Sequence, residues 1–184
     1  MLVYYLGFLG MRFSFNSIVS LVFFVAFNAI QVHSVASANQ LFNSTEVSIR
    51  DYDAVADKDA VSRIVSESVP QLGITGDVWV RQLDGDTQVS VILVNGVVAG
   101  FIEYTLFAES NSGHVFYFAI DPQYRDKGLG RQLMNYVVIR LKKNGAQTIR
   151  LNAYSNNIKA IKFYTKFGFL AQKEQGTCTN FVLA

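Results

Sequence analysis

"DPQYRDKGLGRQL", residues 121–133, lies between an apolar run and an amphipathic run, and it contains Gly128 and Gly130 where a helix is expected to begin. Glycine within a helix costs roughly 0.5–1 kcal/mol relative to alanine, so both positions need another explanation. A strand that enters a helix through such a loop directs unpaired backbone N–H groups along the helix dipole, which favours binding of a phosphate or pyrophosphate. Three basic residues add positive charge: Arg125, Lys127 and Arg131. The alternative is a plain strand-to-helix turn whose glycines serve tight packing.

Two other phosphate-binding motifs do not fit this stretch. The dinucleotide fingerprint GxGxxG needs glycine at position 133, where the chain has Leu133. A P-loop needs Gly-Lys followed by serine or threonine, which residues 121–133 lack.

The segments around the loop follow strand and helix patterns in turn. In chain order the sequence predicts a strand at 47–50, a helix at 57–67, a loop at 71–77, two long strands over 88–107 joined by Asn95-Gly96, a strand at 114–120, a helix at 129–141, a strand at 147–154, a helix from Ser155-Asn156 to Gly168, and a strand at 179–184. An Asn-Gly pair between apolar runs is a strong hairpin signal. This order favours an α/β domain with a mixed sheet covered by helices.

Both helices of the second half have one apolar face. In the helix at 129–141 the buried stripe is predicted to contain Leu129, Leu133, Met134, Val137, Val138 and Leu141. In the last helix Lys159, Lys162 and Lys166 are expected to face water, and the inward residues are Ile158, Ala160, Ile161, Tyr164 and Phe167.

Two motifs carry a family resemblance. Residues 125–130, Arg-Asp-Lys-Gly-Leu-Gly, resemble the R/Q-x-x-G-x-G/A signature of the GNAT superfamily of N-acetyltransferases. Residues 157–169 resemble that family's N-x-x-A-x-x-x-Y-x-x-x-G-F segment. The resemblance covers roughly Val47 to Ala184 and is weakest in its first half. It implies a single α/β (α+β) domain with a mixed, mostly antiparallel central sheet flanked by helices.

The resemblance also implies acetyl-CoA as co-substrate and an amine as acceptor. The residues expected to hold acetyl-CoA are Ala119, Ile120, Arg125, Asp126, Lys127, Gly128, Leu129, Gly130, Arg131, Asn157 and Ala160. The end of the strand at 118–120 is expected to offer main-chain groups to the pantetheine arm and the developing oxyanion.

Transfer to an amine needs an acid for the departing thiolate and a base for the amine. Tyr164 stands where the family has its tyrosine, and a phenol with a reference pKa of about 10 stays protonated beside a forming thiolate. Glu103 is the predicted base, directly or through water, and Tyr117 and His114 are alternatives. The competing interpretations are a core aromatic for Tyr164 and a solvent-facing strand residue for Glu103.

Composition excludes several other classes of function. A net charge of +2 without a basic stripe gives no indication of nucleic-acid binding. Cys178 is the only cysteine, so an internal disulfide and a CxxC metal site are excluded, and we interpret it as a small buried or sheet-edge residue. His33 and His114 lie far apart in the sequence, and no metal is expected.

The first 38 residues predict a targeting segment. The apolar run at 17–31 follows Arg12 and precedes Ala36-Ser37-Ala38, as in a secretory signal peptide cleaved near Ala38, which would place the protein outside the cytoplasm or in the periplasm. A membrane anchor, with contact through residues 11–32, is the second possibility. The third is a start-site error before a cytoplasmic enzyme, and Met11 is an alternative start. Residues 39–45 are then a linker, which contains the glycosylation sequon at 43–45, and residues 46–184 are the N-acetyltransferase domain.

The acceptor groove is expected, by the same resemblance, at the first helix and the loops at 71–77, 84–87 and 108–113. These loops contain four carboxylates, Asp77, Asp84, Asp86 and Glu109, which indicates a cationic acceptor such as a lysine, an N-terminal amine or a polyamine. Two other functions stay open: a non-catalytic module that binds CoA or acyl-CoA, and an exported interaction protein. The predicted export conflicts with a need for acetyl-CoA, a cytosolic metabolite.

Overall fold

The computed structural model describes residues 3–5, 12–14, 45–68, 75–81 and 87–184. The chain divides into two compact units, Met1–Thr45 and Glu46–Ala184. In the first unit, β1 (Val3–Tyr5) pairs antiparallel with β2 (Arg12–Ser14), and the sequence patterns did not predict these short strands.

The predicted targeting segment is almost entirely outside the described residues. This holds for the apolar run at 17–31, the cleavage site near Ala38, Met11 and His33, so that export or anchoring stays a prediction. Among the helices that the structure describes, none has the length and apolar character to span a bilayer.

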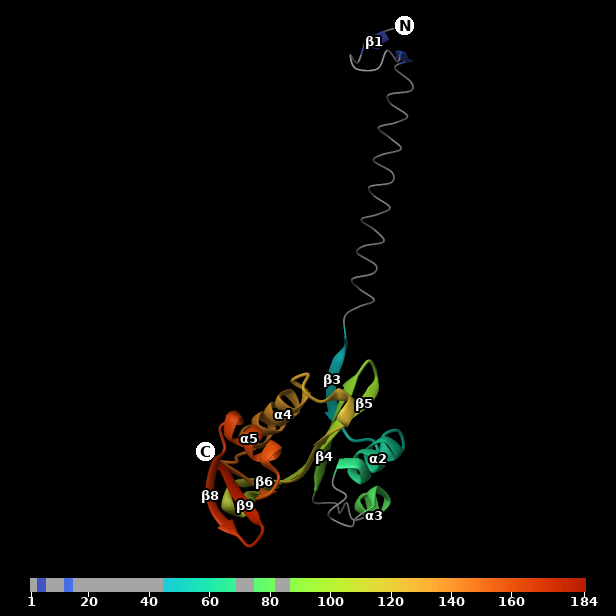
Figure 1. The fold of residues 1–184 in the computed structure, drawn as a ribbon. Helices are drawn as coiled ribbons and strands as arrows, with labels where there is room; N and C mark the ends of the chain where they lie inside the picture. Colours follow the sequence, from blue (N-terminus) through green and yellow to red (C-terminus); the bar gives the residue numbers. More distant parts are fainter. Residues whose placement is uncertain (1–2, 6–11, 15–44, 69–74, 82–86) are drawn as a thin grey trace. The chain divides into compact units, whose positions relative to one another are not determined.

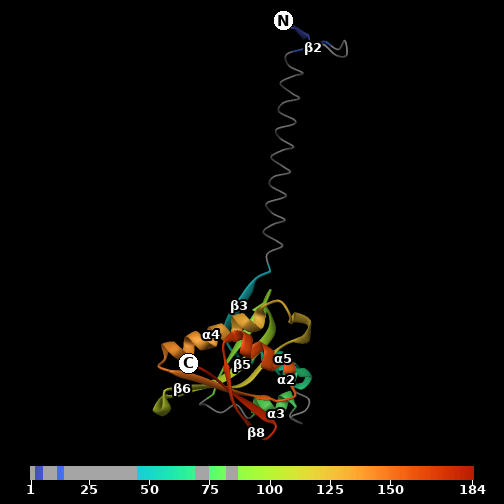
Figure 2. The same ribbon diagram turned by 60° about the vertical axis from the view of Figure 1, so that its left-hand side comes forward.

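The second unit contains a seven-stranded sheet (Figures 1 and 2) with the strand order β3-β4-β5-β6-β7-β9-β8. The strands are β3 (Val47–Asp51), β4 (Gln88–Val94), β5 (Val97–Phe107), β6 (Ser112–Ile120), β7 (Thr148–Tyr154), β8 (Leu170–Gln175) and β9 (Cys178–Leu183). Neighbours are antiparallel except β6 and β7, which run parallel. The predicted α/β fold with a mixed, mostly antiparallel sheet is therefore confirmed.

Helices cover both faces of this sheet. They are α2 (Lys58–Ser68), α3 (Gly76–Arg81), α4 (Leu129–Lys143) and α5 (Ile158–Phe167), with short 3₁₀ turns η2 (Ala108–Ser110) and η3 (Pro122–Tyr124). Figure 1 shows α2 and α3 on one side of β4 and β5, and α4 on the other. Since successive strand residues point to opposite faces, Phe101 packs with α2 and α3, while Ile102 packs with α4.

The strongest sequence patterns are confirmed. The hairpin between β4 and β5 turns at Asn95-Gly96, whose φ angles of 51° and 78° are those of a turn with two left-handed residues. The whole predicted stripe of α4 is buried: Leu129, Leu133, Met134, Val137, Val138 and Leu141. The lysines of α5, at 159, 162 and 166, are exposed as predicted.

Four local predictions are wrong. Gly76 and Asp77 belong to α3, not to a loop, because a six-residue helix is too short to show periodicity. The strand β8 was missed because its sequence, Leu-Ala-Gln-Lys-Glu-Gln, is polar, as an edge strand often is. The N-cap of α5 is Asn157, one residue after the predicted Ser155-Asn156. Ile158, which was predicted to face inward, is 55% exposed because it lies in the first turn of α5.

Candidate active site between two diverging strands

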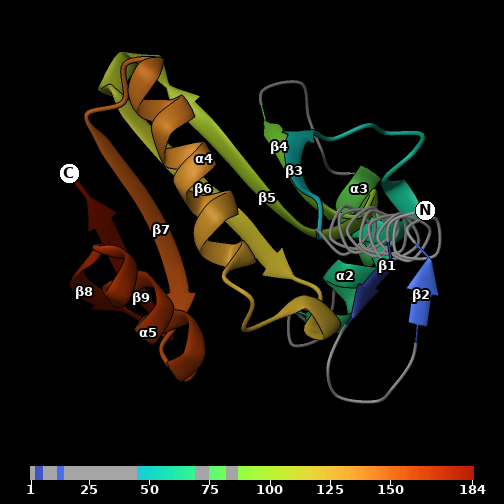
Figure 3. The ribbon, with the colours of Figure 1, turned by 90° about the horizontal axis from the view of Figure 1, so that it is seen from above.

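The parallel strands β6 and β7 separate halfway along their length. Their pairing covers only Ser112–Val115 against Thr148–Leu151, whereas β6 stays paired with β5 as far as Ile120. A register shift against β5 leaves Phe116 as an extra residue of β6, and such a bulge bends its strand. Figure 3 shows the ends of β6 and β7 well apart. The predicted splayed strand end therefore lies beside an opening in the sheet.

A cavity of about 300 Å³ lies at this opening. Its lining comes from β6, β7, β9 and α5 together with one residue of β5: Phe101, His114, Val115, Phe116, Tyr117, Phe118, Ala119, Asn152, Ala153, Tyr154, Asn157, Ala160, Tyr164 and Cys178. The structure thus brings together Ala119, Asn157, Ala160 and Tyr164 from the predicted site. Cys178 is half-buried in β9, which lies between β7 and β8, so it is not at the sheet edge.

Tyr164 lies on the buried face of α5, where it is 8% exposed. Its ring contacts Phe163, Phe169 and Phe181 at centroid distances of 5.5, 5.9 and 5.7 Å. Burial raises the pKa of Tyr164 to about 12, because the anionic phenolate is poorly solvated there. The hydroxyl is therefore a proton donor at neutral pH. It is also a core aromatic, so the two interpretations of this residue are compatible.

Asn157 caps the helix that carries Tyr164. Its side-chain oxygen accepts a hydrogen bond from the backbone N–H of Ala160 at 3.1 Å. This bond fixes the first turn of α5 beside the cavity. The side-chain oxygen is engaged in the cap, so a contact with a pantetheine arm falls to the side-chain amide nitrogen.

Glu103 is buried in β5, at 7% exposure, so the solvent-facing interpretation is wrong. Its Oε2 accepts a hydrogen bond of 2.8 Å from the indole Nε1 of Trp79, which lies in α3. Glu103 is the register partner of Tyr117 on β6, and paired residues project from the same face. Tyr117 lines the cavity, whereas Glu103, its neighbour on the same sheet face, is not among the lining residues.

The two alternative bases are both cavity residues. Burial, followed by the charge of Glu103 and then by Tyr154, raises the pKa of Tyr117 above its usual value. Burial, assisted by Arg150, lowers the pKa of His114, so this imidazole is neutral at neutral pH.

The N-terminus of α4 is formed as the glycine pattern predicts. Gly128 is the N-cap with φ 77°, and a Cβ there would meet no atom within 4 Å. The first helical bond runs from the N–H of Gln132 to Gly128, so the amides of residues 129–131 precede the helical hydrogen bonds. Gly130 has a different role, because its Cβ would lie 3.3 Å from Cζ of Phe118. Gly128 thus leaves room beside the main chain, and Gly130 allows close packing.

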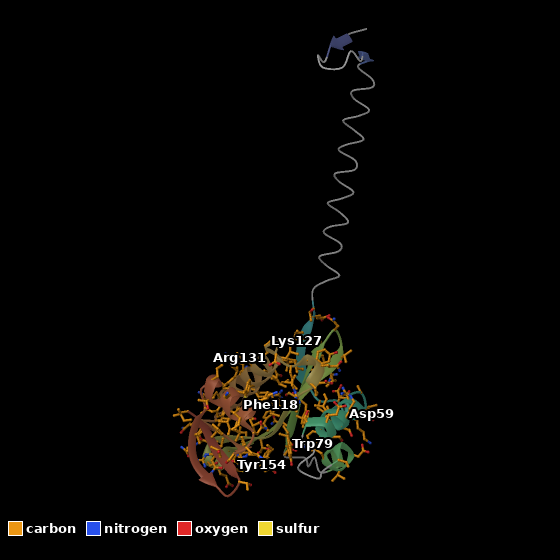
Figure 4. The ribbon with its side chains drawn as sticks, in the orientation of Figure 1. Asp59, Trp79, Phe118, Lys127, Arg131 and Tyr154 are labelled. Carbon is orange, nitrogen blue, oxygen red and sulfur yellow. The ribbon has the colours of Figure 1, made fainter. Side chains whose placement is uncertain are left out.

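The three basic residues of the loop and of the first turn of α4 make defined contacts. Nε of Arg125 donates to the carbonyl of Ile120 at 2.9 Å, and Arg131 donates to the carbonyl of Lys166 at 3.1 Å. The ammonium of Lys127 lies 5.4 Å from the ring centroid of Tyr124. Arg125 therefore joins the loop to the end of β6, and Arg131 joins α4 to α5. In Figure 4 Lys127 and Arg131 lie above Phe118, and Trp79 and Tyr154 lie below it.

An ion pair between half-exposed Arg63 and the buried carboxylate of Asp121, which the sequence did not reveal, anchors the start of this loop. Asp121 is 2% exposed and accepts from Arg63 of α2 at 2.6 Å and from the N–H of Gln123 at 3.1 Å. Burial alone would raise the pKa of Asp121, but the hydrogen bonds from Arg63 and Gln123 more than offset it, so the pKa is lowered. Arg63 and Asp121 are far apart in sequence, and no local pattern joins them.

The predicted acceptor loops are described only in part. Asp84, Asp86 and residues 71–74 lie outside the described residues, whereas Asp77 and Glu109 are exposed. Trp79 was also missed as a site residue, although it is the only tryptophan of the chain. Within the part of the chain that the structure describes, no three His, Cys, Asp or Glu side chains form a metal-binding group. That no metal takes part stays a prediction.

Comparisons with known proteins agree on one family. Residues 59–169 match the sequence profile described as the acetyltransferase (GNAT) family. A mycothiol acetyltransferase of Actinosynnema mirum is 27% identical over 132 residues, which cover 67% of this chain and 44% of that protein. The [ribosomal protein bS18]-alanine N-acetyltransferase of Escherichia coli is 36% identical over 76 residues, or 41% and 49% of the two chains. The spermine/spermidine N(1)-acetyltransferase of Bacillus subtilis is 36% identical over 81 residues, or 40% and 53%.

The chain spans about half the length of the curated relatives it matches. Among solved structures, the PaiA N-acetyltransferase of Thermoplasma acidophilum in complex with coenzyme A has a TM-score of 0.64 and 21% identity, and the match covers 74% of this chain and 98% of that one. At this identity the likeness shows the fold. The family profile covers more than half of the sequence, and the chain therefore belongs to the GNAT family of acetyltransferases.

Proposed function

We propose that this protein transfers an acetyl group from acetyl-CoA to a primary amine by direct attack. The observation that carries the proposal is the opening between β6 and β7, where the sheet stops pairing and its cavity is lined by Tyr164. The amides that start α4 lie beyond one end of β6, and Glu103 lies beside Tyr117 on the opposite sheet face to α5.

The residues of the opening fit acetyl-CoA. A diphosphate is accommodated by the open space beside Gly128 and by the amides of residues 129–131, with Lys127 and Arg131 nearby. Beyond Val115 the strand β6 has no partner in β7, so main-chain groups of Phe118 and Ile120 face the opening and can pair with an extended pantetheine arm, whereas those of Ala119 face Phe101 of β5. Asn157 lies on the other wall, where its amide nitrogen can donate a hydrogen bond to the arm.

Two side chains handle the protons. Acetyl-CoA supplies the acyl group as a thioester, so the reaction forms an amide C–N bond and breaks the C–S bond. Tyr164 donates a proton to the departing sulfur, because its raised pKa keeps it protonated. Glu103 receives the proton of the attacking amine through Tyr117 or a water molecule, since Tyr117 lines the cavity and is the cross-strand neighbour of Glu103.

For the acceptor we propose a cationic amine. Asp77 and Glu109 are exposed carboxylates on the expected acceptor side, and the aromatic residues Phe116, Tyr117 and Tyr154 of the cavity suit a cation. The relatives named above act on mycothiol, on an alanine of a ribosomal protein and on spermine or spermidine, so these classes define a starting panel.

The test is a panel of amines assayed for thiol release, with the acetylated product identified by mass. The panel contains a peptide with an internal lysine, a peptide whose N-terminal residue is alanine, spermidine, and a neutral amine of similar size. We expect transfer to at least one cationic amine, and a several-fold higher acceptor KM in the double variant Asp77→Asn, Glu109→Gln. No release with any amine contradicts the proposed activity. An unchanged acceptor KM in the variant contradicts only the cationic acceptor.

A further inference from the structure

Trp79 makes a specific contact that its location in a short helix does not require. It is 2% exposed, its ring lies 4.8 Å from Phe101, and it meets Tyr117 edge-on at 6.1 Å with an interplanar angle of 79°. Apolar packing alone would be satisfied by these two rings. The indole N–H nevertheless donates a hydrogen bond to Oε2 of Glu103, with an N–O distance of 2.8 Å. This distance is typical of a charge-assisted hydrogen bond.

A buried carboxylate needs such a donor to act as a base. Removal from water favours its neutral form, while a hydrogen bond to the carboxylate favours the ionised form. Indole is only a donor, so its bond to Glu103 is stronger when Glu103 is ionised, and the bond also restricts rotation of the carboxylate. The contact thus selects the form and the orientation that proton abstraction requires.

We infer that Trp79 is a positioning residue for the reaction: its indole N–H keeps the carboxylate of Glu103 ionised and oriented beside Tyr117. The inference rests on the proposed function, because it gives Glu103 the role of base. It adds that α3, which packs on α2 at the acceptor side of the sheet, is part of the catalytic apparatus. The competing explanation is that the bond only fastens α3 to the sheet.

Other titratable groups share this region. Tyr117 and His114 project from the same strand, and the residue opposite Glu103 on β4 is the apolar Val89. Burial raises the pKa of Tyr117 and lowers that of His114, so of these two groups His114 is the one that titrates in the acid range. An experiment on Glu103 therefore needs a variant of His114 as a control.

The first experiment replaces the indole N–H of Trp79 with a group that cannot donate a hydrogen bond. Since the chain has a single tryptophan, replacing tryptophan throughout with its benzothiophene analogue, which has sulfur in place of the N–H, changes only position 79. We expect the acid limb of the kcat/KM profile to move up by about one pH unit, because loss of the donor destabilises the ionised carboxylate. At a pH below the apparent pKa of the acid limb, a shift of about one unit corresponds to about a tenfold loss of kcat/KM. The matched control is 5-fluorotryptophan, which keeps the N–H and should keep the acid limb in place.

A change in thermal midpoint accompanied by an unmoved acid limb would overturn the inference, since a purely structural bond predicts that result. The variant Trp79→Phe gives an independent check, because it also lacks the donor and should move the limb in the same direction.

The second experiment needs no substrate. Tryptophan emission of this chain reports Trp79 alone, so it should follow the ionisation of its partner. We expect one acid transition in the natural protein and in His114→Gln, and no transition in Glu103→Gln. Persistence of the transition in Glu103→Gln would refute the coupling between Trp79 and Glu103. If the amine panel shows no transfer, the proposed function fails while this titration still reports on the pair. If transfer occurs and Glu103→Gln keeps full activity, the inference fails alone.

Discussion

Tyr164 combines a core position with a reactive hydroxyl. Burial raises its pKa to about 12, so the phenol is protonated at neutral pH. We predict that Tyr164→Phe lowers kcat by roughly 10²–10⁴-fold, the usual contribution of a general acid, with little change in acetyl-CoA affinity. Initial rates and calorimetric titration measure the two quantities.

The matched control is Tyr136→Phe, which removes a hydroxyl bonded to Arg140 on α4, outside the cavity lining. It should leave kcat unchanged. A Tyr164→Phe protein that turns over at the natural rate would assign the proton to another group. Binding of acetyl-CoA without turnover in the natural protein would favour the non-catalytic CoA module.

At this scale the sequence predicted the residues that belong to local motifs. Gly128, Asn157 and Tyr164 each lie in a short pattern, and the structure brings the last two into one cavity and places the first at the start of α4. The contact between Trp79 and Glu103 could not be predicted from the sequence, because only the folded chain brings α3 next to the distant strand β5. The role of Gly130 also required coordinates, since its contact with Phe118 crosses from helix to sheet.

At the scale of elements, the ion pair between α2 and the loop before α4 determines how that loop is held. We predict that Arg63→Ala lowers the free energy of unfolding by about 1–3 kcal/mol at neutral pH, because it leaves the buried carboxylate of Asp121 with one fewer donor. Urea midpoints measure this difference.

The same pair predicts a pH dependence. The pKa of Asp121 in the folded protein is below its reference value of 3.8, so the stabilisation is present above about pH 4 and is lost as the pH falls through the lowered value. The difference between the natural protein and Arg63→Ala should therefore shrink at about pH 3. A constant difference from neutral to acid pH would mean that the ion pair does not stabilise the fold.

The position of α3 depends on a close approach to α2. A Cβ at Gly76 would lie 1.9 Å from the carbonyl oxygen of Ser62, so we predict that Gly76→Ala destabilises the protein by about 1–3 kcal/mol and changes the emission of Trp79. Thermal unfolding and fluorescence check both effects. Val78→Ala, at an exposed residue of the same helix, should change stability by less than about 0.5 kcal/mol. An equal change in stability in the two variants would contradict this close packing of α3 on α2.

Element prediction succeeded where the pattern was long. The hairpin at Asn95-Gly96 and the fifteen-residue α4 each have a continuous apolar period. The short α3 and the polar edge strand β8 have no such period, and tertiary contacts with α2 and β9 determine their structure.

At the scale of the whole molecule, the proposed reaction and the predicted localisation require different compartments: acetyl-CoA is cytosolic, whereas the N-terminal segment predicts export. We propose export or anchoring through residues 1–38 as the first hypothesis, with a cytoplasmic enzyme as the alternative. Fractionation of cells that express the chain with a C-terminal tag, together with the mass of the mature chain, decides between them. A full-length cytoplasmic protein would remove the conflict with the supply of acetyl-CoA.

The central claim is that the opening between β6 and β7, with the start of α4, binds acetyl-CoA. The most direct measurement is the thermal midpoint of the full chain with increasing acetyl-CoA. At about 100 times its Kd the ligand should add roughly 2.7 kcal/mol to the free energy of unfolding, and so raise the midpoint by several degrees. In Gly128→Ala, whose side chain enters the space proposed for the diphosphate, the increase should be smaller. A midpoint that does not move at millimolar acetyl-CoA, or that moves equally in both proteins, would contradict the account.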